Sequence, residues 1–206
     1  MTLNKEDLLK SILDSFSHLD YIKAEDIPNI DLYMDQVTTF MSEHLKDSKR
    51  YEQDKVLTKT MINNYAKNHL LPPPSKKKYS KEHLLVMIFI YYFKDFLSFS
   101  DIQAILSPLN ERFFQSGTDF NMEWIYREVF CLGKKELSVL QNDVQRMYEA
   151  SMDAFPDAAE EDAEFLHTFA MICLLSFDVY IKKQLIEKLI DDCSRQTDEE
   201  KPNKKK

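Results

Sequence analysis

Hydrophobic side chains recur at helical spacing along most of the chain, with polar residues between them. Residues 4–18 carry one such row, at Leu8, Leu9, Ile12, Leu13 and Phe16. Residues 31–45 carry a second row, at Leu32, Val37, Phe40, Met41 and Leu45. The pattern predicts a helix over each segment, and the charged residues 46–56 predict a connection after the second one.

Residues 57–80, LTKTMINNYAKNHLLPPPSKKKYS, combine the signals of a helix with the signals that end one. Thr58 or Thr60 can cap a helix that runs to about His69. The prolines at 72–74 end it, because proline lacks an amide hydrogen and disfavours helical geometry in the residue before it.

The next segment, KEHLLVMIFIYYFKDFL, follows Ser80 as its cap and is apolar almost all round. Such a helix is expected to lie at the centre of its domain. A further helix is predicted from Ser98, which stands three residues before Asp101 as in a capping box, to about Pro108.

Longer helical patterns follow Thr118, over residues 119–132, 134–153 and 158–193, with Gly133 as a kink or cap. Acidic residues begin the last pattern and lysines lie toward its end, which suits the helix dipole. An acidic cluster of this kind needs no metal or catalytic role.

Glycine is scarce, with only Gly117 and Gly133 in 206 residues, so the chain is poorly suited to hairpin-rich or doubly wound folds. We therefore expect an all-α fold. Residues 1–110 form an N-terminal helical domain in this interpretation, residues 119–193 a helical C-terminal bundle that dimerises or senses a signal, and residues 194–206 a disordered tail.

The same composition excludes several classes of enzyme. Phosphate loops, dinucleotide fingerprints and nucleophile elbows need glycines that this chain lacks, and there is no HExxH motif. Cys131, Cys173 and Cys193 are too dispersed to form a CxxC metal or redox site. The sequence predicts a protein that is not an enzyme, with no catalytic residues, metal ligands or cofactor.

The localisation predicted from the sequence is cytoplasmic. The N-terminus, MTLNKEDLLKSILDSF, is unlike a secretory signal. The apolar run from Phe165 to Phe177 contains His167 and ends at Asp178, and it falls short of the roughly 20 residues that a membrane span needs. Three thiols without a framework spacing suit a reducing compartment.

Charge is unevenly distributed along the chain. Residues 49–83 hold nine Lys and Arg against three Asp and Glu, a net charge of +6. Because the whole chain carries -8, the remainder carries -14. A basic surface on an acidic protein attracts a polyanion at one side and repels it elsewhere.

The predicted helix after Leu57 has a polar side within this basic region. Lys59, Asn63 and Lys67 recur at intervals of four residues, with Asn64 and Asn68 beside them. Lysine neutralises phosphate and asparagine can pair with the N6 and N7 atoms of adenine, so the row is suited to a DNA major groove. A solvated helix face is the simpler interpretation.

The order of motifs from Leu57 to Leu106 resembles the winged helix-turn-helix domain of MerR-type transcription regulators. The recognition helix of that family ends in a tyrosine, polar residues and Leu-Leu-x-Pro, a wing closing on Tyr-Ser follows, and an apolar helix precedes a GFSLxEIxxLL segment. The matching residues are Tyr65, Leu70, Leu71, Pro72, Pro73, Lys76, Lys77, Lys78, Tyr79, Ser80, the run 84–93, Leu97, Ser98, Phe99, Asp101, Ile102, Ile105 and Leu106.

This resemblance implies a site on two elements. Residues of the recognition helix would face the DNA groove: Thr58, Lys59, Asn63, Asn64 and Lys67. Residues of the wing would hold the DNA backbone: Lys77, Lys78 and Tyr79, assisted by Lys76 and Lys81.

The stretches IDLYMDQV, LTKTMINNYAKNHLLPPP and KKKYSKEHLL are also similar to the bacterial domain-of-unknown-function family 1836, from about Ile27 to about Pro108. Two features depart from the MerR pattern. A charged segment of about ten residues precedes Leu57 where a short turn is usual, and Asn63 and His69 replace a basic residue and a glycine.

The resemblance and the charge together predict a bacterial DNA-binding transcription regulator whose partner is double-stranded DNA. A homodimer would present two recognition helices about 34 Å apart, one turn of duplex. The alternative is a helical adaptor that uses the MerR-like scaffold to bind protein.

Overall fold

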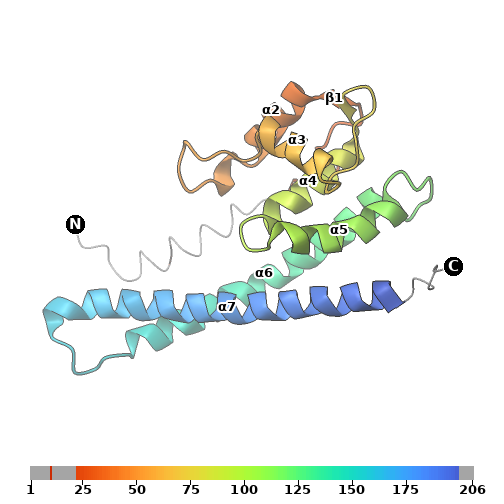
Figure 1. The fold of residues 1–206 in the computed structure, drawn as a ribbon. Helices are drawn as coiled ribbons and strands as arrows, with labels where there is room; N and C mark the ends of the chain where they lie inside the picture. The colour runs from red at the N-terminus through yellow and green to blue at the C-terminus, as the bar shows by residue number, and fades with distance from the viewer. Residues whose placement is uncertain (1–9, 11–21, 200–206) are drawn as a thin grey trace. The chain divides into compact units, whose positions relative to one another are not determined.

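The computed structural model describes residues 22–199 together with Lys10, so the helix predicted over residues 4–18 lies outside the described residues. The structure is mainly helical, as predicted, with one small two-stranded sheet (Figure 1). It divides into two compact units. Of the described residues, 22–131 and 189–199 belong to the N-terminal unit, and Lys10 and 132–188 belong to the C-terminal unit.

The elements of the N-terminal unit begin with a short strand and end in a long helix. In chain order they are β1 (Leu32–Tyr33), α2 (Met34–His44), the 3-10 turn η1 (Lys46–Ser48), α3 (Lys59–Lys67), β2 (Lys78–Tyr79), α4 (Lys81–Phe93), α5 (Phe99–Phe113) and the start of α6 (Met122–Met152). Helix α7 (Glu160–Glu199) follows α6.

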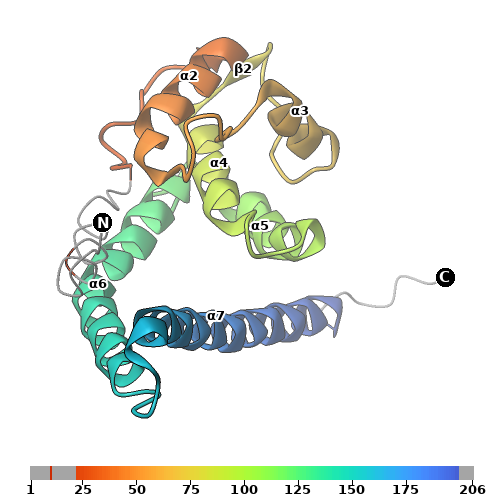
Figure 2. The ribbon, with the colours of Figure 1, turned by 90° about the vertical axis from the view of Figure 1, so that its left-hand side faces the viewer.

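Helix α4 is the core of the N-terminal unit, as its all-round apolar sequence predicted. Every residue from His83 to Tyr91 is buried. Figures 1 and 2 show α2, α3 and α5 grouped around it. The start of α6 packs on the same helix, where the Tyr126 ring lies 5.6 Å from the Phe89 ring.

Helix α3 forms where its cap and stop signals predicted. The Thr58 hydroxyl accepts a hydrogen bond from the Met61 amide at 3.2 Å. At the other end the Leu70 amide donates to the Tyr65 carbonyl at 2.9 Å and the His69 amide to the Ala66 carbonyl at 3.3 Å. This is a Schellman motif, with His69 at φ 59° in the position that glycine usually occupies.

The strands β1 and β2 add a small sheet to the mainly helical fold and correct the prediction of one helix over residues 31–45. They pair antiparallel, with Leu32 opposite Tyr79 and Tyr33 opposite Lys78. Leu32 and Tyr33 fell within the helix predicted over 31–45, because a two-residue strand is too short to show a period of two. Pairing with a segment more than forty residues later decides their conformation.

Two predicted helix boundaries were wrong. Pro108 lies inside α5 rather than at its end, so tertiary contacts outweigh the cost of a proline in a helix. Gly133 lies inside the continuous helix α6 and breaks nothing. The boundary between the units falls after Cys131, within α6, further along the chain than the predicted end at residue 110.

The C-terminal unit contains the rest of α6 and most of α7, joined by residues 153–159. Helix α7 continues to Glu199, so residues 194–199 of the predicted tail are helical. Among the described residues, one stretch, Glu160–Arg195, is long and apolar enough by length and composition to cross a membrane. The shorter run noted in the sequence did not reach that length.

The side chain of His83, in the first turn of α4, contacts the residues of β2 and the cap of the helix. Its Nδ1 accepts a hydrogen bond from the Ser80 amide at 3.0 Å, so the proton of the neutral ring lies on Nε2. The ring packs edge-on against Tyr79 and Phe114, at 5.5 and 4.8 Å between centroids. Burial lowers the pKa of His83 below its ordinary 6.5, against weaker opposing effects of the Pro73 carbonyl and Asp31.

We expect His69→Gly to raise the free energy of unfolding by about 0.5–1 kcal/mol, because glycine adopts positive φ without steric cost. Chemical denaturation at neutral pH measures the change. His44→Gly is the matched control: His44 lies in α2 with helical geometry, so its replacement should lower stability by about 1 kcal/mol. A loss of stability in both variants would contradict the Schellman assignment.

The buried neutral His83 makes stability depend on pH. The unfolded chain binds a proton at His83 near pH 6.5, whereas the folded chain resists it, so this stability is complete above that pH and declines as the pH falls. We expect His83→Gln, which retains an acceptor for the Ser80 amide, to lose less stability between pH 7.5 and 5.5 than the parent chain. Denaturation midpoints at the two pH values test this, and equal losses would refute it.

Candidate nucleic-acid interface

Helix α3 has a buried side and an exposed polar side. Ile62 and Tyr65 are buried in the N-terminal unit. The exposed side contains four of the five residues predicted to face a groove: Lys59, Asn63, Asn64 and Lys67. The fifth, Thr58, is half-buried and uses its hydroxyl as the helix cap, which accounts for this residue without DNA.

Asn63 and Asn64 differ in whether their side-chain amides are free to bind another molecule. The Asn68 side-chain amide donates to the Asn64 carbonyl oxygen at 2.8 Å and to its Oδ1 at 2.9 Å. Asn63 makes no side-chain hydrogen bond within the described residues. Asn63 is therefore the amide on α3 with both donor and acceptor available to a base edge.

The cations on α3 also differ. Lys59 forms an ion pair with Asp35 of α2, although both side chains are more than half exposed. An exposed pair of this kind contributes about 0–1 kcal/mol and can be exchanged for a phosphate. Lys67 has no ion pair within the described part of the chain and lies in the last turn of the helix.

The segment predicted to form a wing is a hairpin whose tip consists of two lysines. The Lys78 amide donates to the Ser75 carbonyl at 2.8 Å, and Lys76 and Lys77 between them have φ values of 49° and 64°. Two central residues with positive φ are typical of the type I′ turn, where asparagine and glycine are preferred. Lys76 and Lys77 are both exposed, and neither has a carboxylate partner in the described residues.

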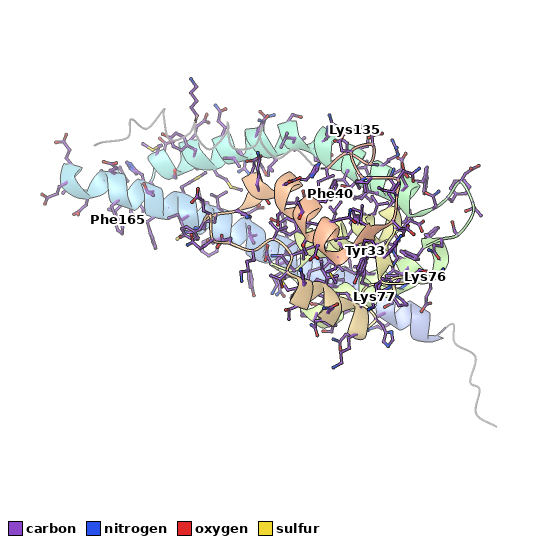
Figure 3. The ribbon with its side chains drawn as sticks, turned by 90° about the horizontal axis from the view of Figure 1, so that it is seen from above. Tyr33, Phe40, Lys76, Lys77, Lys135 and Phe165 are labelled. Carbon is purple, nitrogen blue, oxygen red and sulfur yellow. The ribbon has the colours of Figure 1, made fainter. Side chains whose placement is uncertain are left out.

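An aromatic residue that the sequence did not single out adjoins this tip. The Lys78 Nζ lies 5.0 Å from the centroid of the Tyr33 ring, and the two residues are opposite one another in the sheet. Tyr33 is 53% exposed. Figure 3 shows Tyr33 close to Lys76 and Lys77. The long-range strand pairing that brings it there left no sequence signal.

Two predicted wing contacts are corrected. Tyr79 is only 3% exposed and its ring packs on His83, so its side chain belongs to the core rather than to the surface. Alternation along a strand explains this, since Lys78 and Tyr79 must point to opposite faces. Lys81 is mostly buried and its Nζ lies 2.9 Å from Glu123, so this charge is already paired.

Helix α5 holds the C-terminal end of α3. The Gln103 side-chain amide donates to the Asn68 carbonyl at 3.1 Å, and the Asn110 amide donates to the Leu70 carbonyl at 3.4 Å. The Tyr65 ring also lies 6.5 Å from the Phe99 ring. Carbonyls left unpaired at the end of a helix are satisfied here, so α5 fixes the C-terminal end of α3.

The part of the chain that the structure describes has no group of three or more His, Cys, Asp or Glu residues suited to a metal ion. The chemistry that the exposed groups of this surface offer is therefore cationic and amide hydrogen bonding. We name the surface formed by Lys59, Asn63, Lys67, Lys76, Lys77 and Lys78 the basic face.

The comparisons with known proteins agree with one of the two resemblances seen in the sequence. The family model described as "Domain of unknown function (DUF1836)" matches residues 22–129, just over half of the chain. No curated protein and no solved structure matches the chain. The matched stretch ends within two residues of the N-terminal unit's boundary in α6, so the family corresponds to this unit. The chain belongs to the DUF1836 family.

Proposed function

We propose that the N-terminal unit binds double-stranded DNA through the basic face, as a MerR-like winged helix-turn-helix regulator of transcription in a bacterial cytoplasm. Helix α3 is the recognition helix of this proposal, and the Ser75–Lys78 hairpin is the wing. The order of the elements supports it, because α2, α3, the hairpin and α4 follow one another as that architecture requires.

The observation that carries the proposal is the tip of the hairpin. Lys76 and Lys77 occupy backbone conformations that cost a residue with a side chain about 1–3 kcal/mol each. A turn selected for stability alone would have asparagine and glycine there. Two exposed, unneutralised cations at a strained turn are best explained by a polyanion that contacts them.

The two parts of the basic face have different roles in this proposal. Lys67 and the wing lysines contact phosphates, which determine affinity but carry no sequence information. Asn63 contacts a base edge in the major groove, where asparagine can pair with adenine. With one such amide available on α3, binding depends more on phosphates than on base sequence.

The alternative, a protein-binding adaptor, would use apolar surface. The exposed side of α3 offers lysine and asparagine instead. This composition favours nucleic acid for the N-terminal unit.

We expect Lys76→Ala/Lys77→Ala to weaken DNA binding and to lower the slope of log affinity against log salt by about 1.8, since each lost phosphate contact removes about 0.9. Fluorescence anisotropy of labelled duplex from the source genome, between 50 and 200 mM salt, measures both quantities. Lys134→Ala/Lys135→Ala is the matched control, with the same charge change on exposed residues of α6 (Figure 3). Equal slopes for the two variants, or no binding by the parent chain at 50 mM salt, would reject the proposal.

A second variant separates charge from folding. Lys76→Asn/Lys77→Gly removes the same two charges but supplies the residues that a type I′ turn prefers. We expect the free energy of unfolding to rise by about 1–2 kcal/mol while DNA affinity falls as in the alanine variant. Unfolding curves and anisotropy on the same preparation test this. Unchanged DNA affinity in the stabilised variant would show that the lysines do not contact DNA.

A further inference from the structure

Few of the described side chains in the C-terminal unit are buried. In residues 132–188 the buried side chains are those of Val144, Ser151 and Met171. The N-terminal unit, by contrast, has a continuous buried helix. A unit that leaves most of its apolar surface exposed is completed by another surface.

The exposed apolar side chains of α7 form a seam. Phe165, Phe169, Ile172 and Val179 are 50–70% exposed, and Ser176 lies between the last two. Their spacing of 4, 3, 4 and 3 residues is that of a coiled-coil seam, which faces a second helix along its length. We name these five residues the α7 seam; Phe165 is labelled in Figure 3.

The seam is an exposed apolar patch on one side of α7. Phe177, Tyr180, Ile181 and Leu185 are also 58–66% exposed, but at 3.6 residues per turn only Tyr180 lies beside the seam, and Ile181 and Leu185 lie on the opposite side of the helix. The apolar residues of the seam and Tyr180 together expose on the order of 500 Å², and a patch of that size on a monomer is often functional. The largest apolar patch of a typical monomer is about 300–600 Å².

Charges on either side of the seam identify the partner. Four acids lie just before it, Glu160, Glu161, Asp162 and Glu164, and three lysines and one acid lie after it, Lys182, Lys183, Lys188 and Glu187. Ile172 is the midpoint of the seam from Phe165 to Val179. Glu161 and Lys183 are equally distant from Ile172 along the helix, as are Asp162 and Lys182. A second α7 running antiparallel, with a two-fold axis at Ile172, therefore places acids opposite lysines.

We propose that two copies of this chain dimerise through antiparallel α7 helices that meet along the α7 seam. The contact is isologous, as a two-fold axis requires. A parallel arrangement would place the acidic ends together and the lysines together. Lys182 and Lys183 form exposed ion pairs with Asp178 and Glu187 of their own helix, which contribute little and leave both lysines accessible. The inference does not depend on DNA binding.

A lipid bilayer is the other apolar environment that α7 could enter. Against it, Asp178 interrupts the apolar stretch and pairs with Lys182 at 2.7 Å, and His167 lies near its start. Charged groups within a span are costly and need partners in the bundle. The symmetric placement of Glu161 with Lys183 and of Asp162 with Lys182 about Ile172 has no purpose in a bilayer but allows a second copy to form two kinds of ion pair.

The mass of the full chain in solution tests the dimer. We expect light scattering to give twice the chain mass at micromolar concentration, and Ile172→Glu to raise the dimer dissociation constant on the order of 100-fold. Val139→Glu is the matched control, since Val139 is equally exposed, at 57%, but lies on α6. Circular dichroism verifies that each variant remains helical. A monomeric parent chain, or equal effects of the two substitutions, would overturn the proposal.

Charge reversal tests the orientation. Glu161→Lys/Asp162→Lys should weaken the dimer on the order of tenfold at low salt, and adding Lys182→Glu/Lys183→Glu should restore it. In a parallel dimer the first pair of changes would relieve repulsion between acids and tighten association. Tighter association would therefore overturn the antiparallel arrangement.

Flotation with phosphatidylcholine and phosphatidylglycerol vesicles tests the bilayer. The parent chain is expected to stay out of the vesicle fraction, and co-flotation would overturn the proposal. Failure of the dimer is distinguishable from failure of DNA binding, because Lys76→Ala/Lys77→Ala should leave the mass unchanged.

Discussion

Burial of helix α4 on all sides is the interaction on which the rest of the N-terminal unit depends. Each of its fully buried Leu, Ile and Met side chains contributes about 1.5–3 kcal/mol when removed from water. A helix with no polar side must be covered all round, and this requirement brings α2, α3, α5 and the start of α6 together. Each of these surrounding elements turns its apolar side toward α4, so its polar side becomes the surface of the unit.

The basic face follows from this arrangement. Ile62 and Tyr65 bury one side of α3, so Asn63 and Lys67 necessarily point outward. His83 and Tyr79 fix β2 to the start of α4, so the lysines just before β2 extend beyond the core. The same packing that stabilises the unit presents its cations, and the rest of the chain, with a net charge of -14, opposes a polyanion elsewhere.

The two units differ in how they remove their apolar side chains from water. The N-terminal unit buries it internally around α4, whereas α7 leaves aromatic and aliphatic side chains exposed along most of its length. In the proposed assembly the C-terminal unit obtains its missing core from a second copy. A dimer would carry two basic faces. If both bind the same DNA duplex, the affinity of the dimer for DNA exceeds that of one copy without any new type of contact.

Local signals in the sequence determined the elements that need only neighbouring residues. Thr58 and the prolines at 72–74 bounded α3, and the unbroken apolar run after Ser80 identified the buried helix, because caps, breakers and periodicity act over one or two turns. The lysine cluster and the asparagine row were equally visible.

Tertiary structure decided what depends on distant partners. Leu32 became a strand by pairing with Tyr79, which in turn placed Tyr79 in the core and Tyr33 beside Lys78. Pro108 remained within α5 although its local signal was to end a helix. A two-residue strand and a tolerated proline gain their stability from packing across the fold, and such contacts leave no periodic pattern in the chain.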